Sequence, residues 1–121
     1  MTRRAKVSYK RVYEPAGAED GYRVLIDRMW PRGVSHERAA LDEWARDLAP
    51  SDDLRRWYGH VPERFDEFRR RYRAELAEHE SELRALRERA RSRPLTIVFA
   101  ARDSEHSNAA VLTELLRHPA R

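Results

Sequence analysis

Two polar segments of this chain carry the residue types best suited to chemistry, and each segment directly follows an apolar run. The first, Asp-Arg-Met-Trp-Pro-Arg-Gly at residues 27–33, follows the run at residues 22–26. The second, Arg-Asp-Ser-Glu-His-Ser-Asn at residues 102–108, follows the run at residues 95–101. Open α/β sheets bind ligands at the carboxyl ends of their strands. If the two runs are parallel neighbouring strands, the two segments are expected to face one crevice.

The arginines of the first segment are suited to binding an anion. Arg28 and Arg32 could hold a phosphate or a carboxylate through bidentate hydrogen bonds. The alternative for Arg28 is an internal ion pair with Asp27, Asp47 or Asp103. We expect Asp103 as its partner. Because a nearby positive charge keeps a carboxyl group ionised, that pair would suit Asp103 to positioning a ligand rather than to general-base catalysis.

The other candidate residues each have a structural alternative. Trp30 could stack on a base or a sugar, or it could cover the core as a plug. Asn108 could contact a ligand, or it could cap the helix that follows it. His106 lies near Asp103 in the second segment. The predicted ligand-binding residues are Asp27, Arg28, Trp30, Arg32, Asp103, His106 and Asn108.

Metal and nucleotide sites have less support in the sequence. No His-x-x-x-His or His-Glu-x-x-His spacing occurs, so a metal site would have to assemble from distant residues, first among them His60, His106 and Asp103. The four glycines are scattered, which excludes a P-loop and a dinucleotide-binding fingerprint. We therefore predict no metal and no cofactor, and the residues leave open whether the protein is an enzyme.

Length and composition indicate a single domain spanning residues 1–121. The absence of cysteine excludes a disulfide framework, a thiol nucleophile and cysteine-bound zinc. No apolar run approaches the roughly 18 residues that a membrane span needs. We therefore expect a cytoplasmic protein with no membrane partner. The sequence does not indicate an oligomeric state.

The net charge of +4 rests on arginine, since Lys6 and Lys10 are the only lysines. Most arginines lie between residues 55 and 93, mixed with glutamate at helical spacing, which is typical of a salt-bridged helix face in solvent. The alternative is a non-enzymatic binding module whose arginine-rich helices contact nucleic acid or a protein partner. We expect any nucleic-acid binding to be weak and non-specific, because acidic residues nearly offset the basic ones.

Strands are predicted at three places in the chain. Residues 6–13 alternate polar and apolar side chains, as a half-buried strand does. Residues 22–26 form a second strand, and the continuous apolar run at residues 95–101 is typical of a strand covered on both faces. The connection at residues 14–21 is short for a parallel crossover, so the first two strands could form either a hairpin or a parallel arrangement.

Helices are predicted between the second and the last strand. Residues 41–48 have helical spacing, and a further helix is expected from a cap at Ser51 to Gly59. An apolar stripe at steps of three and four then covers residues 65–90, with a break near residues 79–81. This order predicts an α/β fold with a small, mostly parallel sheet flanked by helices. The arrangement would be three-layered and Rossmann-like, with a long helical insertion before the last strand.

The segment Asp-Gly-Tyr-Arg-Val-Leu-Ile-Asp-Arg-Met-Trp-Pro-Arg-Gly at residues 20–33 resembles the opening signature of the YeaO-like proteins. These proteins are a branch of the family catalogued as domain of unknown function 488. The resemblance continues through Leu-Arg-Arg-Trp-Tyr-Gly-His at residues 54–60 and Ala-Ala-Arg-Asp at residues 100–103, so it covers nearly the whole chain. It implies a small α/β protein whose biochemical activity is not established.

The same resemblance limits the chemistry that can be carried over. Other branches of the family have a Cys near the end of the last strand and a Cys-His-Arg in the following loop. By order along the motif, these positions fall near Phe99 and on residues 107–109, where the chain has no such side chains. YeaO-like proteins commonly have Lys before Glu37, where this chain has His36. Thiol or Cys-His chemistry is therefore not implied here, whereas the Asp-Arg strand end and Asp103 are retained.

Overall fold

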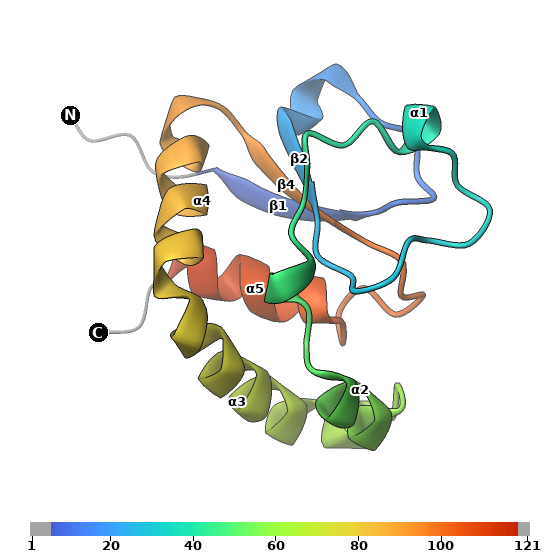
Figure 1. Cartoon of the computed structure of the whole chain (residues 1–121), viewed down its shortest axis with the longest axis vertical. Helices are drawn as coiled ribbons and strands as arrows, with labels where there is room; N and C mark the ends of the chain where they lie inside the picture. Colours follow the sequence, from blue (N-terminus) through green and yellow to red (C-terminus); the bar gives the residue numbers. More distant parts are fainter. Residues whose placement is uncertain (1–5, 119–121) are drawn as a thin grey trace.

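The computed structural model describes residues 6–118. In this part of the chain a parallel sheet carries helices on both faces (Figure 1). The strands are β1 (Val7–Arg11), β2 (Tyr22–Leu25), β3 (Glu43–Trp44) and β4 (Leu95–Phe99). The α-helices are α1 (His36–Ala39), α2 (Asp52–Tyr58), α3 (Phe65–Leu76), α4 (Glu80–Ser92) and α5 (Asn108–Arg117).

The sheet has the strand order β1-β4-β2-β3, and its three pairings are parallel. β4 lies between β1 and β2, and Ile97 is the register partner of both Tyr9 and Val24. All of its side chains are buried, as its continuous apolar run predicts. The predicted interior position of β4 is therefore confirmed. β1 pairs in parallel with β4 and forms no hairpin with β2.

Side chains that alternate along the strands enter two cores. Val24 and Ile97 belong to the main core, which α2, α3, α4 and α5 cover from one face of the sheet. Leu25 and Val98 belong to a smaller core on the opposite face, together with Ala39 of α1. α1 and its neighbouring loops cover that face, which gives the three layers that the sequence predicts (Figure 1).

The long apolar stripe forms two helices separated by a tight turn. α3 ends at Leu76, the 3-10 turn Ala77–His79 follows, and α4 begins at Glu80, which confirms the break predicted near residues 79–81. Ser51 caps α2 by accepting a hydrogen bond from the backbone N–H of Leu54, and Gly59 ends this helix with a φ of 53°. None of the helices described here is both long and apolar enough to cross a membrane.

The prediction of a helix at residues 41–48 is wrong. This segment forms the edge strand β3 and the 3-10 turn Arg46–Leu48. The backbone N–H groups of Asp42 and Ala45 donate to carbonyl oxygens of β2, which adds the segment to the sheet. These hydrogen bonds are made with a distant part of the chain, so they override a local spacing that would also suit a helix.

A buried ion pair fixes the turn that leads into β2. Arg23 is only 3% exposed, and its Nη1 lies 2.6 Å from Oδ2 of Asp20. Its Nε and Nη2 donate to the backbone carbonyl groups of Ala39 and Ala40 at the end of α1. Between these residues Gly21 has a φ of 66°, and a Cβ atom there would lie 2.1 Å from the carbonyl oxygen of Pro94. The entry into β2 thus requires both the ion pair and the glycine.

Candidate functional site

A cavity of about 660 Å³ lies at the carboxyl ends of β2 and β4, and we call it the strand-end crevice. Residues 27–32 and 100–103 line it directly after the two strands, and His106, Ser107 and Asn108 line it from the start of α5. Because β2 and β4 are parallel neighbours, the two segments meet at the same edge of the sheet. The cavity falls within the volume range of small-molecule sites in proteins.

Asp27 follows β2 and contributes to the inner wall of the crevice. Its Oδ2 accepts a hydrogen bond from the backbone N–H of Ala100 at 2.8 Å, and its Oδ1 accepts one from Nδ2 of Asn108 at 3.1 Å. Burial raises the pKa of the Asp27 carboxyl above its ordinary value, and the two hydrogen bonds partly oppose this shift. Asp27 therefore joins the end of β2 to the segment that follows β4.

The first turn of α5 is capped by Ser107 and not by Asn108. Oγ of Ser107 accepts a hydrogen bond from the backbone N–H of Ala110 at 3.1 Å and donates one to the carbonyl oxygen of Ser104 at 2.7 Å. The amide of Asn108 is therefore available to reach β2, where Nδ2 also lies 3.4 Å from the carbonyl oxygen of Ile26. Of the two roles predicted for Asn108, the capping role is wrong, because Ser107 caps the helix. The ligand-binding role stays a prediction.

The outer part of the crevice is lined by four exposed arginines: Arg28, Arg32, Arg55 and Arg102. The ion pair expected between Arg28 and Asp103 is not formed. Nε of Arg28 lies 3.7 Å from Oδ1 of Asp52, and Nη2 of Arg55 lies 3.3 Å from the same oxygen. The carboxylate near Arg28 is therefore that of Asp52 in the first turn of α2, and not the expected one of Asp103. Within residues 6–118, the guanidinium groups of Arg32 and Arg102 form no ion pair or hydrogen bond.

Asp103 is instead held within its own loop. Its Oδ2 lies 2.8 Å from Nδ1 of His106, and its Oδ1 accepts a hydrogen bond from the backbone N–H of the same residue at 3.2 Å. Hydrogen bonding to His106 lowers the pKa of the Asp103 carboxyl below its ordinary value. Such a carboxylate is a poor general base near neutral pH, which is consistent with a positioning role.

Trp30 packs into the smaller core while still lining the crevice. Its ring stacks on His36 with a centroid distance of 4.0 Å, and it meets Trp44 edge-on at 5.3 Å. Its Nε1 donates to the carbonyl oxygen of Val34 at 2.6 Å. These contacts favour a role for Trp30 in covering the core over a role in stacking on a base or a sugar. They also give His36 a packing partner.

Several lining residues were not predicted from the sequence. Arg55 and Tyr58 come from α2, and the hydroxyl of Tyr58 donates to the carbonyl oxygen of His106 at 2.7 Å. No spacing in the sequence indicates that α2 lies beside this edge of the sheet. His60, which the sequence suggested only as a metal ligand, reaches the crevice through a left-handed backbone conformation with a φ of 59°. Arg102 could have been found, because it comes directly after the apolar run that contains β4.

The three residues expected first as metal ligands, His60, His106 and Asp103, all line the crevice. In the described part of the chain, however, no three histidine or acidic side chains come together as a group that could hold a metal ion. A zinc site needs three or four such ligands at close range. The three side chains are therefore available to a ligand as separate polar groups.

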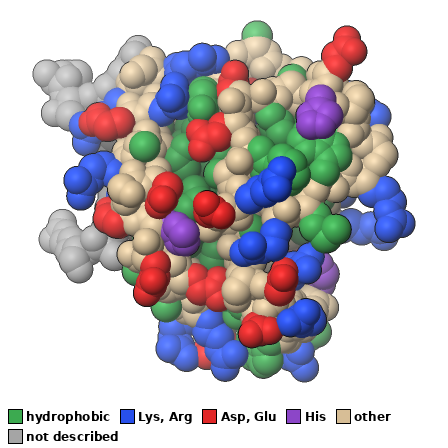
Figure 2. Space-filling view, in the orientation of Figure 1, with side chains coloured by type: hydrophobic (Ala, Val, Ile, Leu, Met, Phe, Trp, Pro, Cys, Tyr) green, Lys and Arg blue, Asp and Glu red, His purple; other side chains and the backbone are tan. Residues whose placement is uncertain are grey.

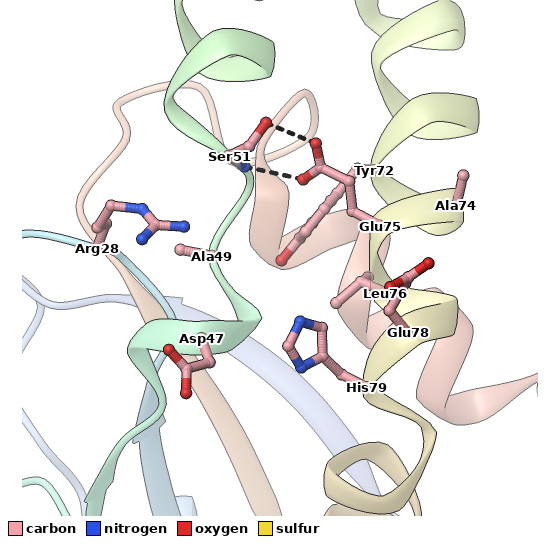
Figure 3. A pocket seen from close by; sticks show the side chains of 10 residues that line it. All are labelled: Arg28, Asp47, Ala49, Ser51, Tyr72, Ala74, Glu75, Leu76, Glu78 and His79. Atoms are coloured by element: carbon pink, nitrogen blue, oxygen red, sulfur yellow. Dashed lines mark hydrogen bonds between the residues drawn. The ribbon is translucent and has the colours of Figure 1, made fainter.

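A second cavity, of about 470 Å³, adjoins the crevice and shares Arg28 with it. Figure 3 shows Arg28 on one side of this cavity and Glu75 and Glu78 on the other. Glu75 is fixed by Ser51, whose backbone N–H and Oγ donate to its two carboxylate oxygens at 2.8 and 2.6 Å. With Asp47, three carboxyl groups line the cavity, which makes it unsuited to an anion.

Acidic and basic side chains are intermingled on the face of the molecule drawn in Figure 2. On α3, Glu67 lies 2.8 Å from Nε of Arg71 and also pairs with Arg70, and these contacts lower its pKa to about 2. On α4, Arg91 lies 3.1 Å from Glu88. These are the salt-bridged helix faces that the alternation of arginine and glutamate predicts.

Comparison with known proteins places these features in a family. The model of a family described as the inactive DUF488-N3 subclade matches residues 6–121. The chain is 44% identical to the uncharacterized protein YeaO of Escherichia coli, over 92% of this chain and 96% of that protein. It is 47% identical to uncharacterized proteins of Mycobacterium bovis and Mycobacterium tuberculosis, over 96% of this chain and 98% of theirs. No solved structure matches the chain significantly.

Proposed function

The chain belongs to the family described as the inactive DUF488-N3 subclade, a group of YeaO-like proteins, and we propose that it binds an anionic small molecule in the strand-end crevice without transforming it. The observation that carries this proposal is the convergence of four arginines on one cavity at the strand ends. Guanidinium groups hold phosphate and carboxylate oxygens through paired, charge-assisted hydrogen bonds. Two of these groups, those of Arg32 and Arg102, would be ready to receive such an anion.

The chemistry of the remaining side chains supports binding rather than turnover. The chain has no cysteine, so it lacks a thiol nucleophile. Asp103 is engaged by His106, and its lowered pKa makes it a weak base. Both carboxylate oxygens of Asp27 accept hydrogen bonds from the protein itself. None of these features hinders recognition of a ligand, and the family description is consistent with them.

The alternative of a binding module for nucleic acid or a protein partner has less support. Arg70, Arg71 and Arg91 lie close to glutamate side chains on the same helices. Glutamate at these positions would repel the phosphate backbone of a nucleic acid. The crevice, in contrast, gathers its arginines around a hollow that a small ligand could fill.

A binding measurement on the purified chain tests the proposal. Isothermal titration calorimetry and thermal unfolding are carried out with inorganic phosphate and with hexyl phosphate, at low ionic strength. Each charge-assisted hydrogen bond to a guanidinium group contributes about 1.5–3 kcal/mol. Arg32→Ala and Arg102→Ala should therefore each weaken binding about tenfold or more. Neither change should alter the melting temperature of the free protein, because both side chains are exposed and unpaired within the described residues.

The matched control is Arg56→Ala. Arg56 lies on α2, forms an ion pair with Asp53 at 2.7 Å, and does not line the crevice. This change removes the same charge from the protein, so it controls for the overall field. If no phosphate compound binds, or if the control weakens binding as much as Arg32→Ala does, the proposal is refuted.

A further inference from the structure

The inner wall of the strand-end crevice differs from its rim in hydrogen-bonding character. The buried or half-buried polar side chains of this wall include Asp27, Tyr58, His106, Ser107 and Asn108, and Nδ1 of His106 already lies against Asp103. Tyr58 donates its hydroxyl hydrogen to the carbonyl oxygen of His106, and Ser107 donates its own to that of Ser104. Nδ2 of Asn108 donates to Asp27. The donors of these side chains are thus already directed at protein acceptors.

Acceptor capacity, in contrast, remains available on the same wall. A carboxylate offers about four lone-pair positions, and Asp27 uses one on each oxygen, toward Ala100 and Asn108. The amide orientation of Asn108 follows from its neighbours, because only its nitrogen can face both the carboxylate of Asp27 and the carbonyl oxygen of Ile26. Its Oδ1 then forms no hydrogen bond within residues 6–118. A ligand group that enters here must donate hydrogen bonds.

The charge of the whole crevice indicates how negative the ligand is. Four arginines line the crevice against Asp27 and Asp103, and Asp52 faces two of these arginines from outside the lining, so one positive charge is in excess when histidine is neutral. A phosphate monoester carries about −1.5 to −2 at pH 7, and this excess attracts it. An amino acid or another zwitterion has no net charge and would leave the excess uncompensated. A single ligand therefore satisfies both regions if it carries a phosphate group for the exposed arginines and hydrogen-bond donors for the inner wall.

Hydroxyl groups are the donors that fit between these two regions. They donate to Asp27 and Asn108 without bringing a positive charge beside Arg55 and Arg28, which an ammonium group would do. The lining of the crevice also contains the buried rings of Tyr58 and Phe68, against which the carbon skeleton of a polyol can pack. We infer that the ligand of the crevice is a phosphorylated polyol or monosaccharide, with its phosphate on Arg32 and Arg102 and its hydroxyl groups on Asp27 and Asn108.

This inference rests on the proposed function and is tested by comparing phosphate esters of equal charge. The probes are a hexitol phosphate, which bears hydroxyl groups, and hexyl phosphate, which has none, with phosphoethanolamine as the ester that carries an ammonium group. Calorimetric dissociation constants should be at least tenfold lower for the hexitol phosphate than for either of the others. The ratio between the hexitol and hexyl esters should fall toward one in Asn108→Ala and Asp27→Asn. The ratio remains informative if a variant is less stable, because both esters are measured on the same folded protein.

The outcomes separate this inference from the proposed function. Equal affinity for the hexitol and hexyl esters overturns the hydroxyl assignment and leaves the anion site intact. Preference for phosphoethanolamine overturns it in favour of a cationic inner group. A hexitol preference that survives both substitutions refutes the roles of Asp27 and Asn108. Failure of all three esters to bind refutes the proposed function itself, and the inference with it.

Discussion

Asp52 should act as an internal competitor for the ligand of the crevice. Its Oδ1 lies 3.7 Å from Nε of Arg28 and 3.3 Å from Nη2 of Arg55, and both arginines line the cavity. An anion that binds these two arginines must replace the contacts of this carboxylate or share them. Asp52→Asn removes the negative charge and keeps the shape of the side chain, so it should strengthen anion binding.

The size of this effect follows from the exposure of the groups. The side chains of Arg28, Asp52 and Arg55 are 41%, 53% and 51% exposed, so solvent screens both ion pairs strongly. Exposed pairs of this kind are worth about 0.2–1 kcal/mol each. Removing the competition of two such pairs should therefore lower the dissociation constant about two- to thirtyfold, since 1.4 kcal/mol corresponds to a factor of ten. The gain should shrink as salt is added, because salt screens exposed charges.

Calorimetric titration with hexyl phosphate at low and at high salt measures this gain. Asp53→Asn is the matched control, because Asp53 neighbours Asp52 in the first turn of α2 and pairs with Arg56, which lies outside the crevice. Both variants remove one negative charge from the amino end of the same helix, so their effects on helix stability should be similar. An unchanged affinity in Asp52→Asn, or an equal gain in the control, would show that this carboxylate does not compete for the crevice arginines.

Three predictions concern stability, and urea denaturation measures each of them. Arg23→Met should lower the free energy of unfolding by about 1.5–3 kcal/mol, because it removes the buried partner of Asp20 and leaves Lys10 as the remaining cation; a loss below about 1 kcal/mol would contradict this. Gly21→Ala should cost about 3 kcal/mol or more and Gly33→Ala only about 1, since both have positive φ but only the first position is crowded. Equal losses would contradict the crowding argument. Burial raises the pKa of the Asp27 carboxyl, so the folded chain keeps this proton to a higher pH than the unfolded chain. The contribution of the protonated carboxyl to the free energy of unfolding is therefore lost as pH rises from about 3.9 through the raised pKa. The stability of Asp27→Asn relative to the wild type should therefore increase between pH 4 and 7, and a constant difference would refute the shift.

The sequence was sufficient to predict those elements whose formation depends on local signals. The apolar run of β4 lacks polar alternation, so only an interior position satisfies it, and the structure places it there. Ser51 and Gly59 bound α2 because the side-chain oxygen and the missing Cβ act on the backbone at those positions. β3 was missed because its pairing with β2 is a contact between distant residues, which the spacing of side chains does not record.

The sequence was sufficient to predict where the candidate site lies, but not which side chains pair with one another in it. Parallel pairing of β2 and β4 dictates that the residues after both strands meet, and those residues do line one cavity. Which carboxylate approaches Arg28 depends on where α2 lies, and the sequence has no signal for that position. The shared contact of Arg28 and Arg55 with Asp52 therefore emerged only from the packed structure.

The two carboxyl groups of the crevice lie in opposite environments, and this bears on how the site is used. Burial raises the pKa of Asp27, whereas hydrogen bonding to His106 lowers that of Asp103. Enzymes separate the pKa values of paired groups in this way to obtain an acid and a base. Here Asp27 is tied to Ala100 and Asn108 through both oxygens, and the chain has no cysteine to serve as a nucleophile. The arrangement keeps a polar inner wall and a cationic rim, which is what the proposed binding of an anionic, hydrogen-bond-donating molecule requires, with no bond made or broken.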